Sequence, residues 1–124
     1  MIKRIAEGAD RIFLACGSTD FRKQIPGLVA MVHMQFKLDP YQGNFVFIFC
    51  NKKRDGIKVL RYDSNGFILA TKKLLDDMKF QWPRTPEDVK EISFQQVEWL
   101  LQGLEIEPKK AHHKVKITVD NTCF

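Results

Sequence analysis

An uninterrupted apolar run lies near the middle of the chain. Residues 45–50 read Phe-Val-Phe-Ile-Phe-Cys, a series of strand-forming side chains with no polar residue between them. Strands that alternate apolar and polar residues have one face in water, whereas a continuous run is typical of a strand covered on both faces. The pattern therefore predicts that residues 45–50 form the central strand of a sheet.

Two further strands are predicted after this run, each behind a cluster of turn residues. Asn51–Gly56 interrupts the apolar pattern, and Ile57–Asp63 resumes it with β-branched and charged residues mixed. Ser64–Gly66 contains an Asn-Gly pair, which tolerates positive φ, and Phe67–Leu74 returns to strand character. These segments predict a three-stranded antiparallel meander.

The N-terminal part predicts a strand and a helix that lead into the central strand. Residues 11–15 form a short apolar run behind a polar lead, and apolar residues with helical spacing mark one face of residues 25–37. Pro26 suits the first turn of this helix, where its missing N–H costs nothing. Strand, helix and central strand in this order are typical of a crossover between parallel neighbours.

The C-terminal part predicts an edge strand, a second helix and a tail. Lys79–Pro83 alternates polar and apolar residues and ends at proline, as edge strands do, and residues 84–88 are expected to be a linker. Ser93 and Gln96 have the spacing of a capping box in front of an apolar helical stripe over residues 93–103. The tail alternates from Val115 to Val119, which indicates a late strand.

Together these elements predict one α+β domain. We expect it to span residues 1–108, with an antiparallel meander of four to five strands and two packed helices, followed by a basic tail over residues 109–124. Of the residues, 44% are hydrophobic and 28% charged, which argues against wholesale disorder. No apolar run approaches the roughly 20 residues of a membrane span, and no signal peptide is evident. We therefore expect a cytoplasmic protein without membrane contact.

The chemical inventory predicts no catalysis. The sequence has no P-loop, no dinucleotide fingerprint, no nucleophile elbow and no H-E-x-x-H motif, so we expect no cofactor and no bound metal. Asp20 and Asp63 are candidates for a cation site for phosphodiester cleavage, but capping and turn roles explain them as well. His112 and His113 in the tail lack a neighbouring Cys or carboxylate and are not expected to bind metal. Three cysteines without C-x-x-C spacing predict no disulfide framework and no zinc knuckle.

Charge is distributed in blocks along the chain. Residues 44–84 carry a net charge of +5, whereas residues 85–107 carry −5. Such polarity fits a nucleic-acid face opposite a solvated one, two complementary faces for self-association, or ordinary surface charge.

Seven basic residues are the candidate nucleic-acid contacts. Long cations on a strand ribbon suit phosphate contacts, and Tyr62 and Phe67 close by suit stacking on bases. The competing interpretation is that lysines keep a hairpin tip soluble and block edge pairing. The residues expected to form one DNA-binding face are Arg22, Lys23, Lys52, Lys53, Arg54, Lys58 and Arg61.

An ordered series of short motifs runs through most of the chain. In order they are Ser18–Lys23, Gly27-Leu28, Phe47–Phe49, Lys53–Asp55, Lys58–Leu60, Tyr62-Asp63, Asn65–Phe67, Lys72-Lys73 and Phe80–Pro83. The series resembles the small TnpB-type accessory protein of a bacterial insertion-sequence family, the sixty-six type, whose elements carry three consecutive reading frames. The resemblance covers about Ile12 to Leu104. It departs at Met78, where glycine is usual, and at Leu74, where a basic residue is common, and both departures concern the turn before Trp82.

The resemblance implies a part in transposition other than catalysis, because the third reading frame of these elements encodes the large transposase. A chain of 124 residues without a recognisable carboxylate triad is also too small for the usual transposase catalytic domain. Two mechanisms follow. In one, the basic hairpin binds DNA of the element and helps to assemble the transposition complex. In the other, the protein binds the transposase or itself and does not contact DNA. The basic block favours DNA binding.

Overall fold

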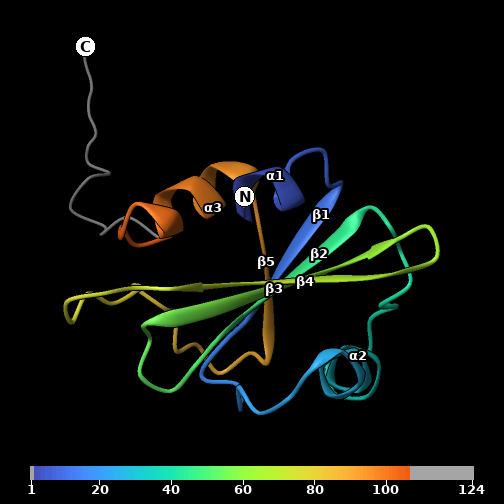
Figure 1. The fold of residues 1–124 in the computed structure, drawn as a ribbon, viewed down its shortest axis with the longest axis horizontal. Helices are drawn as coiled ribbons and strands as arrows, with labels where there is room; N and C mark the ends of the chain where they lie inside the picture. Colours follow the sequence, from blue (N-terminus) through green and yellow to red (C-terminus); the bar gives the residue numbers. More distant parts are fainter. Residues whose placement is uncertain (1, 107–124) are drawn as a thin grey trace, which may run out of the picture.

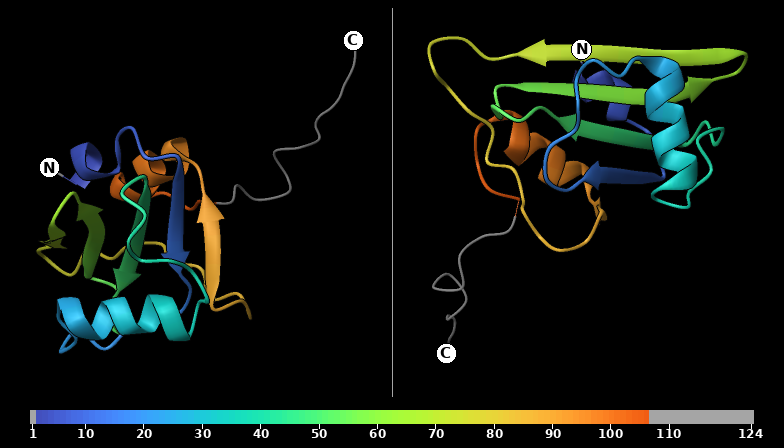
Figure 2. Two further views of the ribbon diagram at one scale, coloured as in Figure 1. Left: turned by 90° about the vertical axis from the view of Figure 1, so that its right-hand side faces the viewer. Right: turned by 90° about the horizontal axis from the view of Figure 1, so that it is seen from below.

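A five-stranded mixed sheet with helices on both faces makes up the protein, as the computed structural model of the chain shows; the structure describes residues 2–106 (Figure 1). Across the sheet the strands are β4 (Gly66–Lys73), β3 (Gly56–Asp63), β2 (Phe45–Cys50), β1 (Arg11–Ala15) and β5 (Val89–Ile92). The helices α1 (Ile2–Ala6) and α3 (Phe94–Leu101) cover one face, and α2 (Ile25–Met34) runs across the strands of the other (Figure 2). The predicted α+β class is confirmed.

The strand β2 is the central strand, as predicted. It pairs parallel with β1, Phe47 standing opposite Phe13, and antiparallel with β3, Phe47 standing opposite Leu60. The helix α2 connects β1 to β2 and forms the predicted crossover. Phe47 and Phe49 are both fully buried, so the continuous apolar run does reflect a strand covered on both sides.

Alternate side chains of β2 supply two separate cores. Val46 and Ile48 pack under α1 and α3, whereas Phe47 and Phe49 pack against α2. Phe13 stacks on Phe47, with 5.6 Å between the ring centroids. Because successive side chains of a strand point to opposite faces, one apolar run fills both layers and fixes the sheet between them.

The strands β2, β3 and β4 form the predicted antiparallel meander. Asp63 pairs with Gly66, so Ser64 and Asn65 make a two-residue turn between β3 and β4. We expected the Asn-Gly pair to adopt the positive φ, and this is wrong: Ser64 adopts it, with φ 55°. Two-residue hairpins use type I′ or type II′ turns, and in type II′ only the first of the two turn residues has a positive φ.

The edge strand β5 lies elsewhere than predicted. The segment 79–83 is not a strand, and Val89–Ile92, which follows the predicted linker, pairs antiparallel with β1 instead. Phe80 and Trp82 are buried in the core beneath α1 and α3. The alternation in this segment therefore reflects a loop that inserts every second side chain into the core.

The helices differ from the prediction in extent. The short helix α1 lies in the stretch expected to be a polar lead, and α2 ends at Met34, three residues before the predicted end. The capping box of α3 is confirmed, since Ser93 Oγ accepts from Gln96 N and Gln96 Oε1 accepts from Ser93 N. No helix within residues 2–106 is long and apolar enough to cross a membrane. The predicted late strand and the His112-His113 pair lie outside the described residues.

Candidate nucleic-acid interface

Three connecting segments lie side by side at one end of the sheet. Because β1 and β2 are parallel, both end there, and β3 begins, β4 ends and β5 begins beside them. The segments are 16–24 before α2, 51–55 between β2 and β3, and 74–88 between β4 and β5. We call this region the loop end. Figure 2 shows the long connection 74–88 passing along it from one edge of the sheet to the other.

Backbone hydrogen bonds join the three segments into one surface. Phe80 N donates to the carbonyl oxygen of Arg54 at 2.7 Å, and Gly17 N donates to that of Pro83 at 3.1 Å. A turn at residues 75–78 precedes these contacts, with Asp76 and Asp77 at positive φ. The turn before Trp82 is thus formed without the glycine that is usual in place of Met78.

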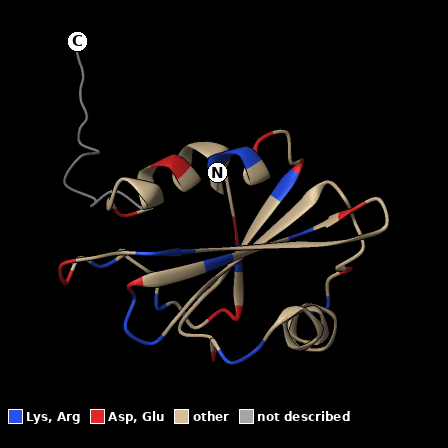
Figure 3. Cartoon of the chain, viewed as in Figure 1, with Lys and Arg blue, Asp and Glu red and all other residues tan. Residues whose placement is uncertain are grey.

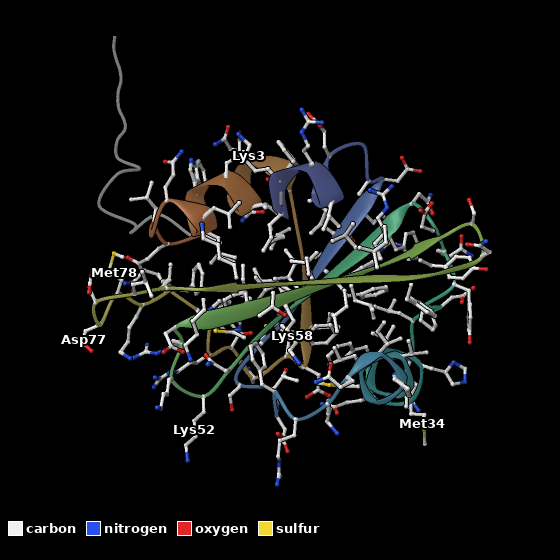
Figure 4. All side chains as sticks on the ribbon, viewed as in Figure 1. Lys3, Met34, Lys52, Lys58, Asp77 and Met78 are labelled. Carbon is white, nitrogen blue, oxygen red and sulfur yellow. The ribbon has the colours of Figure 1, made fainter. Side chains whose placement is uncertain are left out.

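Five of the seven predicted DNA contacts lie at the loop end: Arg22, Lys23, Lys52, Lys53 and Arg54. Lys52 and Lys53 are exposed and Arg54 is half-buried. Within residues 2–106 these last three side chains form no salt bridge. Figure 3 shows basic residues on the loops at this end of the sheet, and Figure 4 places Lys52 on the opposite side of the molecule from Lys3. The loop end therefore presents cations to solvent.

Arg22 is bound to a carboxylate of its own turn. Its Nε and Nη2 donate to the carboxylate of Asp20 at 2.8–3.1 Å, and its backbone N donates to Oδ1 at 2.9 Å. These hydrogen bonds, from the side chain first, lower the pKa of Asp20 to about 2. Asp20 thus holds a turn, as expected, and partly neutralises Arg22.

Lys58 does not belong to the predicted face. It is 6% exposed, and its Nζ donates to the carbonyl oxygens of Phe21 at 2.9 Å and Lys23 at 3.0 Å. The ammonium group also lies over the ring of Phe21, 4.9 Å from the centroid. The pattern of charges on β3 did not distinguish this buried lysine from an exposed one. Lys58 positions the segment that carries Arg22 and Lys23.

Arg61 lies on the opposite face of the sheet from Lys58, because the two are three positions apart on β3. Its Nε donates to Gly43 O at 2.8 Å, and its Nη1 donates to Ile5 O at 2.6 Å and Glu7 O at 3.3 Å. Arg61 joins α1 to the loop before β2. The expectation that all seven cations form one face is therefore wrong for Lys58 and Arg61.

One further expectation, that aromatic rings lie beside the cations, is also wrong, and the two candidate carboxylates lie apart. Tyr62 and Phe67 lie at the end of β3 and β4 remote from the loop end. Their ring centroids are 5.1 Å apart, and each lies 5.4 Å from the ring centroid of Tyr41. Asp63 lies at the same remote end, whereas Asp20 lies in the loop end. The length of β3 separates the two carboxylates. Within residues 2–106 no group of three His, Cys, Asp or Glu side chains is arranged to hold a metal ion.

Two cations of the loop end were not predicted. Lys79 Nζ donates to Lys53 O at 2.9 Å, and Arg84 is exposed on the connection toward β5. Both fall in segments that we expected to be an edge strand and a linker. In the sequence, both residues contribute to the net charge of +5 over residues 44–84, and this block of charge is the signal that could have identified them.

A cleft of about 440 Å³ opens between the three segments. Lys52, Arg54 and Arg84 line it together with the carboxylates of Glu87 and Asp88. Its remaining walls come from residues 16–18 after β1, Asn51 after β2, and Trp82, Thr85 and Pro86. The cleft therefore lies beyond the carboxyl ends of the two parallel strands, where α/β sheets commonly bind ligands.

The sequence matches a known family over most of its length. A family model described as IS66 Orf2 like protein matches residues 10–111, and the chain belongs to this family. It is also similar to two Sinorhizobium fredii (strain NBRC 101917 / NGR234) proteins, uncharacterized proteins y4jC and y4hO, with 35% and 36% identity over 95 residues. These matches cover 77% of this chain and 80% and 81% of theirs. No solved structure matches the chain. The resemblance noted from the motifs is confirmed, and the family places the protein among the accessory proteins of IS66 transposition.

Proposed function

We propose that this accessory protein binds DNA through its loop end and does not itself catalyse transposition. The observation that best supports DNA binding is the convergence of cations from three separate segments. Among them Lys52, Lys53, Arg54 and Arg84 form no salt bridge within the described part of the chain. Cations that form no salt bridge attract a polyanion more strongly than the same charges already paired.

Phosphate contacts of this kind have a measurable signature. Each phosphate that a lysine or arginine neutralises releases condensed counterions, so log affinity falls with log salt by about 0.9 per contact on duplex DNA. A phosphate contact carries no base information, so the effect is nearly the same for all sequences. An arginine fork can also read guanine in the major groove, and Arg54 and Arg61 are the two arginines considered for that role. Arg54 lines the cleft with Lys52 and Arg84, which favours a phosphate contact for it instead. The donors of Arg61 are occupied by backbone carbonyls, which removes it from that role.

The test is fluorescence anisotropy on labelled duplexes with and without the terminal sequence of the element, across a salt series. Lys52→Ala and Lys53→Ala are each expected to reduce the salt slope by about one. Lys3→Ala is the matched control, because Lys3 is an exposed lysine on the far side of the molecule with one surface salt bridge. Undetectable binding at low salt, or equal slopes for all three variants, would contradict DNA binding by the loop end.

The non-catalytic part of the proposal is supported by the separation of Asp20 and Asp63 along β3. Phosphodiester cleavage by two metal ions needs carboxylates that bind ions about 3.5–4 Å apart. We expect the purified protein not to cleave plasmid DNA with Mg²⁺ or Mn²⁺. Cleavage that disappears in Asp63→Asn would show that the protein is a nuclease.

A second candidate function is recognition of a partner protein, such as the transposase. Leu75 and Met78 are 70% and 54% exposed on the turn after β4, beside Asp76 and Asp77. Figure 4 shows Met78 and Asp77 together at one edge of the molecule. Such a turn suits a partner with apolar and basic groups. Replacing Leu75 and Met78 by serine is then expected to abolish retention by immobilised transposase. DNA affinity that persists in that variant would separate the two functions.

A further inference from the structure

We propose that the cleft at the loop end binds one unpaired nucleotide of a DNA strand, its phosphate facing Lys52, Arg54 and Arg84 and its base facing Glu87 and Asp88. This inference rests on the proposed DNA binding and adds to it the class of DNA structure that is recognised: a strand end or an extruded base. The class follows from the size, the position and the mixed charge of the cleft.

The size of the cleft suits a small organic ligand. Its volume of about 440 Å³ lies within the usual range for ligand pockets, roughly 300–1,000 Å³. A DNA duplex is too wide to enter such a space, since one of its grooves alone is wide enough to hold an α-helix. A single nucleotide is small enough to enter. The cleft therefore fits a nucleotide taken out of the base-paired stack.

One side of the cleft is a loop with fixed ends. Gly17 N donates to Pro83 O, and Cys16 N donates to Asp88 O, so both ends of the segment 83–88 are bound to the chain just after β1. Pro83 and Pro86 further restrict its backbone. Beneath the loop, the indole Nε1 of the buried Trp82 donates to Ala15 O at 2.9 Å. Arg84 and Glu87 thus stand on a loop whose position is set by the core.

The other side of the cleft is the turn that carries Lys52 and Arg54. Arg54 has a left-handed backbone, φ 63°, which strains a residue other than glycine. The conformation is held because Arg54 N donates to Asn51 O and Arg54 O accepts from Phe80 N. Glycine would adopt this backbone without the strain, so the arginine side chain is present at the expense of stability. Strain of this kind is typical of functional sites.

The carboxylates of Glu87 and Asp88 favour a nucleotide over a bare phosphate as the ligand of the cleft. Cations alone would suit any phosphate, but Glu87 and Asp88 repel a free anion that fills the cleft. Thr85 Oγ1 lies 3.2 Å from Cys16 Sγ, and its hydrogen bond to Glu87 is the main cause that lowers the pKa of that carboxyl. The Thr85 hydroxyl has one proton to donate, and a carboxylate is a stronger acceptor than the sulfur of Cys16. The hydroxyl therefore donates to Glu87 and favours its ionised form, which can accept further hydrogen bonds. Carboxylates accept from the exocyclic amino group of cytosine, so cytosine is preferred to thymine.

The experiment compares a blunt duplex with the same duplex carrying one unpaired cytosine or thymine, placed at the 3′ ends in one series and at the 5′ ends in another. In at least one series we expect the cytosine duplex to bind about tenfold more tightly than the blunt one. Arg84→Ala is expected to remove most of this advantage, and Arg4→Ala, an exposed arginine on α1, is expected to retain it. The double variant Glu87→Ala, Asp88→Ala should lose the preference for cytosine over thymine while binding the blunt duplex at least as well. Thermal melting checks that each variant is folded.

The outcomes separate this inference from the proposed function. Salt-dependent binding that is equal for blunt and overhanging duplexes would overturn the inference and leave DNA binding intact. The cleft is also probed without duplex, by following backbone amides of residues 16–18 and 51–54 while dCMP is added. Saturable shifts that inorganic phosphate does not reproduce are expected. Equal competition by phosphate and dCMP, or no shift with either, would overturn the assignment to a nucleotide.

Discussion

The Nζ of Lys58 lies 2.9 Å from the carbonyl oxygen of Phe21, to which it donates a hydrogen bond, although the two residues are 37 positions apart. The same ammonium group donates to Lys23 O, so one buried cation fixes the backbone of the segment before α2. Lys58 therefore acts on the loop end through position rather than through contact with DNA.

Replacing Lys58 by methionine tests this positioning role. Methionine retains the apolar stem but leaves two carbonyl oxygens without their donor, which is expected to lower the free energy of unfolding by about 1–3 kcal/mol. Lys72→Met on the exposed part of β4 is the control, expected to change it by less than about 0.5 kcal/mol. Urea denaturation measures both. Equal stability of the two variants would show that the Lys58 contacts contribute nothing.

Phe47 is the second residue with a large expected effect, because it stands on the central strand and stacks against Phe13. Phe47→Ala removes a fully buried aromatic ring and is expected to cost about 3–5 kcal/mol of unfolding free energy. The denaturant midpoint is the measurement. Phe67→Ala, in a half-buried ring on the edge strand β4, should cost clearly less. A midpoint of Phe47→Ala equal to that of the native protein would contradict the burial.

These two residues show how far the sequence predicts the fold. The prediction for Phe47 is correct because six apolar, strand-forming residues in a row, followed by turn residues, are typical of a strand covered on both faces. The crossover from β1 to β2 and the capping box of α3 also follow from local signals, namely apolar spacing and the pair Ser93 and Gln96. Lys58 was misplaced because its partners are backbone carbonyls 35 and 37 positions away, and nothing in its own neighbourhood encodes them.

The misplaced elements have a similar cause. The helix α1 has only five residues, too few for a periodic pattern, and it forms because Ile2 and Ala6 are buried against the rest of the core. Phe80 and Trp82 mimic a strand because an inserted loop also buries every second side chain. Of the site, the sequence predicted Lys52, Lys53 and Arg54 through their charge. It did not predict the cleft, which exists only because loops far apart in the chain meet at one end of the sheet.

The buried thiol of Cys50 is expected to lower the free energy of unfolding at alkaline pH. The thiol is fully buried, and burial raises its pKa from 9.0 to about 12. The folded protein favours the protonated thiol, so this contribution is complete below pH 9 and is lost as the pH rises from 9 toward 12. At pH 10 the native protein is expected to have lost about 1 kcal/mol through this group. The difference in unfolding free energy between native protein and Cys50→Ala, measured from pH 8 to 11, should shrink; a constant difference would contradict the raised pKa.

The pair of Asp20 and Arg22 predicts a variant with higher DNA affinity. Asp20→Asn removes one negative charge and releases the guanidinium of Arg22, so the salt slope is expected to rise by up to about one. Because the pKa of Asp20 in the folded protein is lowered to about 2, its carboxylate stays charged at every pH well above that value. The gain should therefore be constant from pH 5 to 8. Lower affinity of Asp20→Asn at low salt would show that the turn matters more than the charge.

Replacing Arg54 by glycine is expected to lower DNA affinity without lowering the free energy of unfolding. Its backbone is left-handed, so Arg54→Gly relieves a cost of about 1 kcal/mol, which offsets much of the extra freedom that glycine gains on unfolding. The unfolding free energy is expected to stay within about 0.5 kcal/mol of the native value or to rise. DNA affinity should fall, with a salt slope smaller by about one, because the side chain that faces the cleft is gone.

The matched control is Arg4→Gly, which introduces the same residue change into the regular helix α1. Glycine there is expected to lower stability by about 0.5–1 kcal/mol and to leave DNA affinity unchanged. Chemical denaturation and anisotropy on the same protein samples measure both quantities. A merely structural arginine at position 54 would give lower stability and unchanged affinity, the reverse of the expected pair of results, and that outcome would remove Arg54 from the interface.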